Sequence, residues 1–555
     1  MTQYEYIVTL NNYDDLEEFY NDMETPGGNL YIPDREVECA VRRNISRNTH
    51  YMLTEEEADE VRNDPRVLAC EKVPSLLGMS PSPMWTQTDA FEKSGTVNST
   101  DKNWGLARVI GGEPVSGWGT DGSFTEYTTT IQCNGSGKNV DVVIVDAHIN
   151  PNHPEFAVNP DGTGGSRVNL YDWFLHSADV GVSTTGSYDY SDISSNHGTH
   201  VAGTCVGNTQ GWARDANIYS MEFNYSGSNA PAGDWALYVF DYIRYWHRSK
   251  PVNSATGIKN PTITNNSWGY AINQVFLSAV NSVGYQGSIV NLIGLNDADK
   301  KTALEQNGVP VPFNTYLYKI PGRVAALEAD IIDAISDGVI VVSSAGNSSW
   351  QIANPSDNDY NQNYVSISGI GNVYHMRGSS PGADTNVICV GSIGTSTSEY
   401  KATYSNYGPR VDVYAPGSNI ISSVYDTTAA SEFEISLVDD PRNSAYKLGS
   451  IDGTSMASPQ VAGYLACLLE SQPTLDQNEC QQWIEQSSTK DQITSTGGGF
   501  GDYTSLGTGS NNRYLYFYKI RQPEGQAYPN AQYKYRRVAG VVYPRPKITR
   551  TVINS

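Results

Sequence analysis

The sequence predicts an α/β protein: a mostly parallel sheet with helices on both faces, preceded by a small ferredoxin-like α/β sandwich domain. Two observations support this fold class. From about residue 104 to residue 500, β-rich apolar runs alternate with helical segments, the pattern of a parallel sheet covered on both faces. Residues 1–73 give the order strand, helix, strand, strand, helix, strand, which implies a ferredoxin-like sandwich.

The elements of the N-terminal unit follow from local patterns. Residues 4–10 (YEYIVTL) alternate and are β-rich, whereas residues 14–23 (DDLEEFYNDM) read as a helix. Thr54 and Glu57 form a capping-box pattern at the start of a second helix, which is expected to run to about Arg62. The remaining strands are expected at residues 37–42, 49–53 and 66–72.

The rest of the chain divides into three parts. Residues 74–103 have the Pro, Gly, Ser and Thr content of a linker, and residues 104–500 hold the large sheet. Its strands are expected at 140–145, 217–223, 261–266, 338–343, 386–391 and 411–414, and its helices at 198–206, 233–248, 323–336 and 455–470. Residues 501–555 form a basic, Tyr-rich extension, interpreted as an edge strand or docking arm because tyrosines alternate in RYLYFYK. A nucleic-acid role for it is the weaker interpretation.

Composition limits the classes of function. The 555 residues suggest about two to four folding units. Sixty acidic and 36 basic side chains give a net charge of −24, which argues against duplex DNA or an anionic membrane as the main partner. No apolar run approaches the roughly 18 residues that span a bilayer, so we expect no transmembrane helix.

The N-terminus and the cysteines bear on location. The start, MTQYEYIV, has no basic region and no long apolar stretch, so no secretory signal is expected in the chain as written, and a cytoplasmic or virion-associated location is favoured. The seven cysteines include no CxxC pair and fit no zinc motif. Most of them are expected to be small buried apolar side chains.

Three segments carry candidate catalytic residues. The apolar run VDVVIVD ends in Asp146, at the sheet edge where open α/β folds place their sites. His197 is the second residue of the segment NHGTHVAGT. Ser455, in the segment GTSMASPQVAG, is expected in the first turn of an apolar helix, where its backbone N–H can face an oxyanion. Considered alone, Asp146 is more simply interpreted as a helix cap or a ligand of loop N–H groups, and Ser455 as an ordinary helix N-cap.

Taken together, Asp146, His197 and Ser455 follow the subtilisin order of a Ser-His-Asp triad. Over roughly residues 101–490 the chain resembles the subtilases, the subtilisin-like serine peptidases, and its segment NWGLARV resembles proteinase K-like members. The resemblance implies that Ser455 attacks a peptide carbonyl, His197 moves the proton and Asp146 orients the imidazole. It implies an endopeptidase of protein or peptide substrates that needs no redox cofactor or catalytic metal.

Two further motifs extend the resemblance to substrate binding. Ala345, Gly346 and Asn347 resemble the subtilase motif whose Asn donates to the oxyanion. The tripeptide Ser267-Trp268-Gly269 resembles the strand that pairs with the substrate backbone beside the primary pocket. Trp268 is bulkier than expected there and is predicted to reshape the subsites.

The N-terminal unit also resembles part of this family. Residues 54–72 are similar to the end of subtilase prodomains, which implies that residues 1–73 assist folding and then inhibit the enzyme from within the chain, as in a zymogen. An unrelated ferredoxin-like appendage is the alternative.

Several features depart from the family pattern. Ala147 and His148 follow Asp146 where a hydroxyl residue and Gly are usual, so a hydrogen bond to the carboxylate is lost, and Gln460 replaces a common His. The interval from residue 267 to residue 347 (347 − 267 = 80) implies an insertion near 270–322, and a second lies near 424–450. Both are expected at the cleft rim, where they would narrow access or bind a partner.

Calcium is the one metal that the resemblance suggests, as a structural ion. Asp412 in VDVYAPG is the candidate ligand, and the alternative is a strand-end carboxylate that binds backbone N–H groups. His148 and His153 could suggest a metal pair, but HPEF is itself subtilase-like, so no metal is expected there.

A second class of function competes with the peptidase. The departures, the insertions, the C-terminal extension and the Tyr-, Asn- and Gly-rich acidic composition also fit a structural or interaction protein on a subtilase scaffold, such as a virion or large-assembly component with weak or no proteolysis. The two functions can coexist in one assembly-associated protease.

Overall fold

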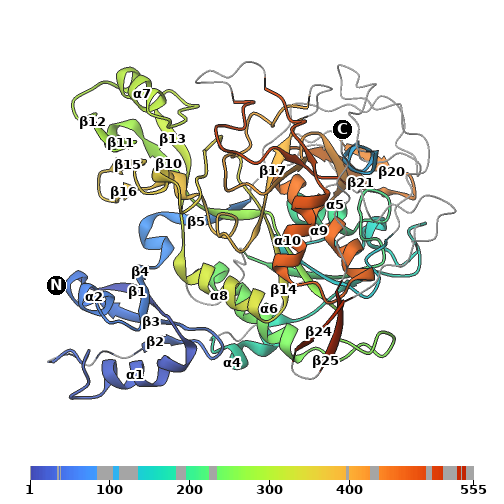
Figure 1. The fold of residues 1–555 in the computed structure, drawn as a ribbon, viewed down its shortest axis with the longest axis horizontal. Coiled ribbons are helices and arrows are strands. Elements are labelled where there is room, and N and C mark those ends of the chain that lie inside the picture. The colour runs from blue at the N-terminus through green and yellow to red at the C-terminus, as the bar shows by residue number, and fades with distance from the viewer. Residues whose placement is uncertain are drawn as a thin grey trace.

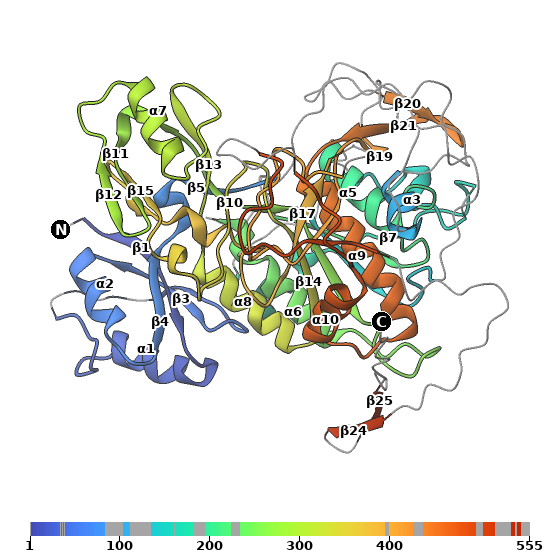
Figure 2. The same ribbon diagram turned by 45° about the horizontal axis from the view of Figure 1, so that its top comes forward.

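The computed structural model describes residues 2–33, 35, 37, 39–83, 104–111, 135–159, 161–182, 195–223, 234–394, 399–425, 437–495, 503–516, 534–538 and 541–545. Figures 1 and 2 show a small N-terminal domain, drawn in blue, beside a larger body whose sheet is flanked by helices. None of the helices in these ranges is both long and apolar enough to cross a bilayer.

The N-terminal domain is a ferredoxin-like sandwich, as predicted. Its antiparallel sheet has the order β2-β3-β1-β4. The bounds are β1 Tyr4–Leu10, α1 Leu16–Glu24, β2 Cys39–Arg42, β3 Asn48–Leu53, α2 Glu55–Arg62 and β4 Val67–Lys72. The capping box at Thr54 and Glu57 is present, because the Thr54 side chain accepts from the Glu57 N–H and the Glu57 side chain accepts from the Thr54 N–H.

The body is built on a nine-stranded sheet of order β22-β23-β18-β17-β14-β9-β6-β8-β7, in which all neighbours but β22 and β23 run parallel. The strands are β6 Asp141–Asp146, β7 Val168–Asn169, β8 Asn217–Glu222, β9 Thr262–Asn266, β14 Val339–Ser344, β17 Ile388–Ile393, β18 Val413–Pro416, β22 Thr489–Lys490 and β23 Arg513–Tyr514. The predicted strands of the large sheet are therefore confirmed in type and place.

Helices cover both faces of this sheet because alternate residues of each strand point to opposite sides. Val142 and Ile144 of β6 pack with α5 (Asn196–Val206) and α9 (Thr454–Ser471). Val143 and Val145 pack with the other face, where α6 (Val239–Ser249) and α8 (Ala325–Ser336) lie. The remaining helices of the body are α3 Trp104–Gly111, α4 Ser177–Val180, α7 Asp297–Gln306 and α10 Gln477–Ser487.

The first insertion supplies β11, β12, β13 and most of β10 to two small sheets, whose other strands come from residues 79–83 and 364–373; the insertion lies at the upper left of Figure 1. One has the order β13-β10-β5 and the other the order β12-β11-β15-β16. The bounds are β5 Met79–Pro83, β10 Trp268–Phe276, β11 Val280–Tyr285, β12 Ser288–Asn291, β13 Tyr316–Pro321, β15 Tyr364–Ile367 and β16 Gly371–Val373. The second insertion lies in the sheet β19-β21-β20, made of β19 Ile420–Val424, β20 Leu437–Asp440 and β21 Asn443–Ile451.

Two predicted boundaries need correction. The segment predicted as a linker from residue 74 is ordered through Pro83, because β5 pairs along β10; residues 84–103 lie outside the described ranges. The extension predicted from residue 501 supplies β23, which lies between β18 and β22 with Tyr514 buried, so this part docks on the body as an inner strand and the edge-strand interpretation is wrong for it. Further on, β24 (Lys534–Val538) and β25 (Val541–Arg545) pair with each other.

Candidate active site

The end of β6 and the start of α5 bring a carboxylate to an imidazole. Asp146 is the last residue of β6, and Nδ1 of His197 lies 2.6 Å from its Oδ1. The Ala147 N–H donates to the same oxygen at 2.8 Å. Because an ionised carboxylate only accepts, the proton of His197 belongs on Nδ1, which leaves Nε2 as the basic nitrogen.

Glycine at position 198 makes this approach possible. A Cβ on Gly198 would lie 2.2 Å from the Ala147 carbonyl oxygen and 2.6 Å from that of His148, distances that real side chains do not reach. The helix is capped by Ser195, whose side chain accepts from the Gly198 N–H at 3.2 Å. The glycine therefore serves close packing of α5 on the loop after β6.

Ser455 lies in the first turn of α9, which packs directly against α5. Its hydroxyl donates to the Ser267 carbonyl oxygen at 3.1 Å, and the Ser267 hydroxyl donates back to the Ser455 carbonyl oxygen at 2.9 Å. Ser458, one turn further along, contacts the same Ser267 hydroxyl at 3.0 Å. These bonds hold the start of α9 against Ser267, the residue that links β9 to β10.

Asn347 presents its amide nitrogen beside this helix start. Its Oδ1 accepts from the Thr454 N–H at 2.9 Å and from the Thr454 hydroxyl at 2.7 Å. An N–H donor requires an oxygen acceptor, so the amide orientation is fixed, and Nδ2 is buried without a hydrogen-bond partner among the described residues. Gly346 has φ +105°, a conformation that favours glycine, and this turn directs Asn347 away from the end of β14. The arrangement suits a donor to a developing oxyanion.

We expect Asn347→Leu to lower kcat about 10²–10³-fold with little change in KM, because the lost donor acts on the transition state. Thr454→Val is the graded control: it removes the hydroxyl bond to Oδ1 and the acceptor of the Gly346 N–H, but keeps the backbone bond to Oδ1 and Nδ2 itself, so its loss should be smaller. Steady-state kinetics on a chromogenic peptide measures both. Equal losses in the two variants would contradict the role given to Nδ2.

The predicted substrate strand is already paired in this structure. Trp268 and Gly269 of β10 lie opposite Pro83 and Ser82 of β5 in antiparallel register. The Trp268 ring is fully buried and stacks on Phe223, with ring centroids 4.9 Å apart. The Trp268 side chain is therefore packed in the core, and its backbone lies at the edge of β10 that pairs with β5.

The departure at residues 147 and 148 has visible consequences. Asp146 Oδ2 is buried and has no hydrogen-bond partner among the described residues, as the loss of a hydroxyl at position 147 would produce. His148 instead contacts Glu222, with Nε2 3.1 Å from Oε2. Glu222 lies opposite Asp146 in the register of β8 and β6, so a second carboxylate–imidazole pair stands beside the first.

The other conspicuous polar residues of the motifs are structural. His200 lies on α5, and its Nε2 donates to the Ile420 carbonyl oxygen at 2.8 Å; burial lowers its pKa to about 3, so it stays neutral. Gln460 accepts from the Trp212 indole at 2.6 Å. His153 is held by the Lys447 carbonyl oxygen at 2.8 Å, away from His148.

The donors around Asp412 do not fit Ca²⁺. Its Oδ2 accepts from the Cys389 N–H and from the Arg410 guanidinium, both at 2.8 Å, and its Oδ1 accepts from Gln481 at 3.1 Å. The carboxylate therefore has the alternative role predicted for it, that of a strand-end acceptor. Within the described ranges, no three His, Cys, Asp or Glu side chains gather as a metal site would require.

Comparison with known proteins identifies the family. A model of the subtilase family, Peptidase_S8, matches residues 137–507, and the chain belongs to this family. Alkaline serine exoprotease A of Vibrio alginolyticus is 24% identical to this chain, in an alignment that covers 80% of this chain and 56% of the relative. The subtilisin-like serine protease pepC of Aspergillus niger is 25% identical, in an alignment that covers 70% of this chain and 52% of the relative. Fervidolysin from Fervidobacterium pennivorans, a keratinolytic enzyme related to subtilisin, aligns over 93% of this chain and 60% of its own, with 15% identity and a TM-score of 0.47. The chain spans little more than half the length of the curated relatives it matches.

Sequence reasoning missed three features of the site. It found neither the pairing of β5 with β10, nor the contact of His148 with Glu222, nor the mutual bonds of Ser267 and Ser455. The first had a weak signal in the run MSPSP, whose prolines suit an edge strand. The other two join residues from different segments and left no local signal.

Proposed function

We propose that this chain is a serine endopeptidase with Ser455 as nucleophile, His197 as general base and acid, and Asp146 as the group that orients the imidazole. The observation that carries the proposal is the 2.6 Å contact between Asp146 Oδ1 and Nδ1 of His197 on α5, a helix that packs against the helix of Ser455. Membership of the subtilase family supports the same chemistry.

The proposed reaction proceeds through an acyl-enzyme. His197 Nε2 takes the Ser455 proton as Oγ attacks the peptide carbonyl carbon, and the imidazolium is stabilised by Asp146. The Ser455 N–H and Asn347 Nδ2 donate to the oxyanion of the tetrahedral intermediate. The imidazolium then returns the proton to the leaving amine, and water hydrolyses the ester in the same way.

We further propose that the N-terminal domain inhibits the enzyme as an intramolecular prodomain. Its β4 is followed by β5, which occupies the edge of β10 where a substrate backbone would pair. The domain also contacts α8, because Glu71 accepts from the Ala326 N–H at 3.1 Å at the start of that helix. Burial raises the pKa of Glu71 to about 7.

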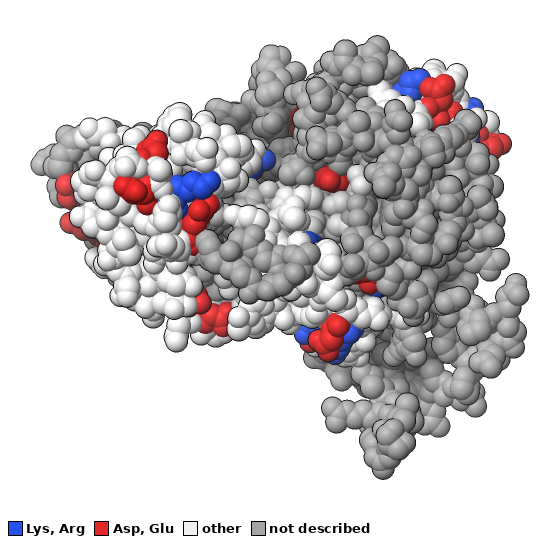
Figure 3. Space-filling view, turned by 90° about the horizontal axis from the view of Figure 1, so that it is seen from above, with Lys and Arg blue, Asp and Glu red and all other residues white. Residues whose placement is uncertain are grey.

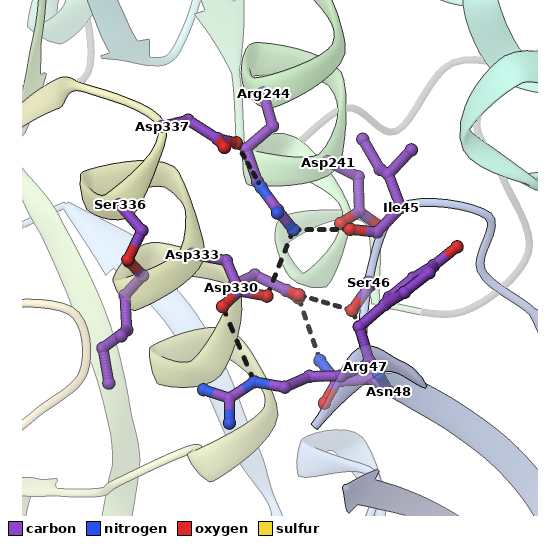
Figure 4. Close-up of polar contacts among 12 residues, drawn as sticks. Ile45, Ser46, Arg47, Asn48, Asp241, Arg244, Asp330, Asp333, Ser336 and Asp337 are labelled. Carbon is purple, nitrogen blue, oxygen red and sulfur yellow. Dashed lines mark hydrogen bonds and ion pairs between the residues drawn. The ribbon is translucent and has the colours of Figure 1, made fainter. Parts of the chain in front are cut away.

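A network of polar contacts holds this domain against α6 and α8 (Figure 4). Arg43 is fully buried and contacts Asp241 of α6 at 2.7 Å and Asp330 of α8. Ser46 donates to Asp330, and Asn48 donates to the same carboxylate at 3.0 Å. Two aspartates on two helices thus enclose one guanidinium. This geometry supports one defined position of the N-terminal domain on α6 and α8.

The decisive test is covalent labelling. A fluorophosphonate should label Ser455 after the N-terminal domain is removed, and Ser455→Ala should abolish both the label and any self-cleavage seen by intact mass. Ser458→Ala is the matched control on the same helix and should keep the label. No labelling of either the full or the cleaved chain would overturn the proposal and leave the structural-protein interpretation.

A further inference from the structure

The oxygen atoms around Arg410 form the surroundings of a cation site. The Arg410 residue is 3% exposed, and its Nη1 lies 2.8 Å from Asp412 Oδ2. The other nitrogens of its guanidinium donate to three backbone carbonyl oxygens, those of Ala383 at 3.2 Å, Val387 at 2.6 Å and Asp384. Carboxylate and carbonyl oxygens are the ligands that Ca²⁺ prefers, but here they surround an arginine.

The contacts of Arg410 join two strands of the main sheet. Asp412 directly precedes β18, and residues 383–387 directly precede β17, its parallel neighbour. The side chain of Arg410 therefore bonds to the chain at the start of both strands. A bound metal ion with ligands from both segments would link them in the same way.

A second guanidinium lies between two carboxylates of the second insertion and the body. Arg442 is in the turn between β20 and β21, and its Nη2 contacts Glu155 and, at 2.6 Å, Asp440 Oδ2. Glu155 is 0% exposed and Asp440 is 1% exposed, so their charges need a cation beside them. Glu155 also accepts from the N–H groups of Thr209 and Gln210, each at 3.0 Å.

The partners of Arg442 belong to the segments that carry the catalytic pair. Glu155 lies in the loop after β6, the strand that ends in Asp146. Residues 209–210 follow α5, the helix that carries His197. One guanidinium of the second insertion therefore holds together the segments that follow both members of this pair.

Most Lys and Arg side chains of proteins lie at the surface, and Figure 3 shows several of them beside Asp or Glu on the described part of one face. From the burial and the oxygen partners of Arg410 and Arg442, we propose that these two side chains are built-in structural cations and that the stability of this chain does not depend on Ca²⁺. A bound metal ion stabilises a fold only at concentrations that fill its site, whereas a side chain is always present. The inference concerns the fold and is independent of the proposed catalysis.

Thermal unfolding of the full Ser455→Ala chain tests this without self-cleavage. Its midpoint should be the same in EDTA, in about 10 mM CaCl2 and in NaCl of equal ionic strength. Arg442→Ala should lower the midpoint by about 4 °C, because two buried carboxylates then face each other without a cation, and Arg410→Ala should lower it by a similar amount. In Arg442→Ala, CaCl2 but not NaCl should recover about half of the loss, because Ca²⁺ can bind between the two carboxylates.

Two further variants separate the charge from the packing. Arg442→Lys keeps the charge, so it should lose less than Arg442→Ala and show no response to CaCl2. Arg248→Ala is the matched control, because the Arg248 side chain is 48% exposed and pairs with Asp337 at 2.8 Å; it should shift the midpoint by no more than about 1 °C.

Three outcomes would overturn the inference. The first is a midpoint of the Ser455→Ala chain that falls in EDTA or rises in CaCl2 beyond the NaCl value. The second is a loss in Arg410→Ala or Arg442→Ala no larger than that in Arg248→Ala. The third is a loss in Arg442→Ala that CaCl2 leaves unchanged, since the place between the carboxylates would then not be a cation site.

Discussion

Asp146→Asn is expected to lower kcat about 10⁴-fold while the protein stays folded. The amide would donate to His197 Nδ1 and so place the imidazole proton on Nε2, which removes the base that faces the serine. The shape of the residue is nearly unchanged, and the fold loses one hydrogen bond, because the Ala147 N–H donates to the same Oδ1 position that the amide nitrogen would occupy. The loss should therefore appear in kcat and leave the urea unfolding midpoint close to that of the parent chain.

Glu222→Gln provides the matched control for this substitution. Glu222 occupies the equivalent position on the next strand and also contacts an imidazole, that of His148. Steady-state kinetics on a short chromogenic peptide should show a change of less than about tenfold, because this carboxylate orients no base. Losses of similar size in Asp146→Asn and Glu222→Gln would mean that both pairs act only in packing, and the assigned roles would fail.

Much of the fold could be predicted because its signals are local. Some central strands of the parallel sheet, such as β6 and β14, are mostly apolar runs, since both faces of the strand are buried. The capping box at Thr54 joins residues three apart, so it can be recognised without any tertiary contact. The same holds for the short motifs around Asp146, His197 and Ser455, which lie on β6 and on α5 and α9, two helices that pack against each other.

The parts that could not be predicted depend on partners far away in the chain. Met79–Pro83 reads as a linker because an edge strand with prolines differs little from a coil until β10 lies beside it. Asp412 could be read as a calcium ligand because only the fold brings the Cys389 N–H and Gln481 to its oxygens. The sequence predicts that Trp268 reshapes the subsites, and only the fold shows that its ring is buried against Phe223.

The docking of the N-terminal domain is the clearest case of a feature hidden from the sequence. Arg43 contacts Asp241 and Asp330, which lie 198 and 287 residues further along the chain. Nothing in the segment VRRN separates Arg43 from its neighbour Arg42, yet the structure gives them opposite environments. The Arg42 side chain is 48% exposed and pairs with Glu24 of its own domain, whereas the Arg43 side chain is fully buried between domains.

Arg43→Ala is therefore expected to reduce the free energy of unfolding by about 3–5 kcal/mol, because it leaves two buried carboxylates facing each other without a cation. Arg42→Ala, the matched control, should cost no more than about 1 kcal/mol, as exposed ion pairs usually do. Urea denaturation of both variants in the Ser455→Ala chain measures the difference without interference from self-cleavage.

Arg43→Ala and Arg42→Ala also test whether docking of the N-terminal domain inhibits the peptidase. In the active chain, Arg43→Ala should raise turnover of a short peptide before any processing, because weaker docking withdraws β5 from the edge of β10. Arg42→Ala should leave that turnover unchanged. If Arg43→Ala destabilises the chain as expected but frees no activity, then the domain stabilises the fold without closing the cleft. In that case the prodomain proposal is wrong, even if the catalytic one survives.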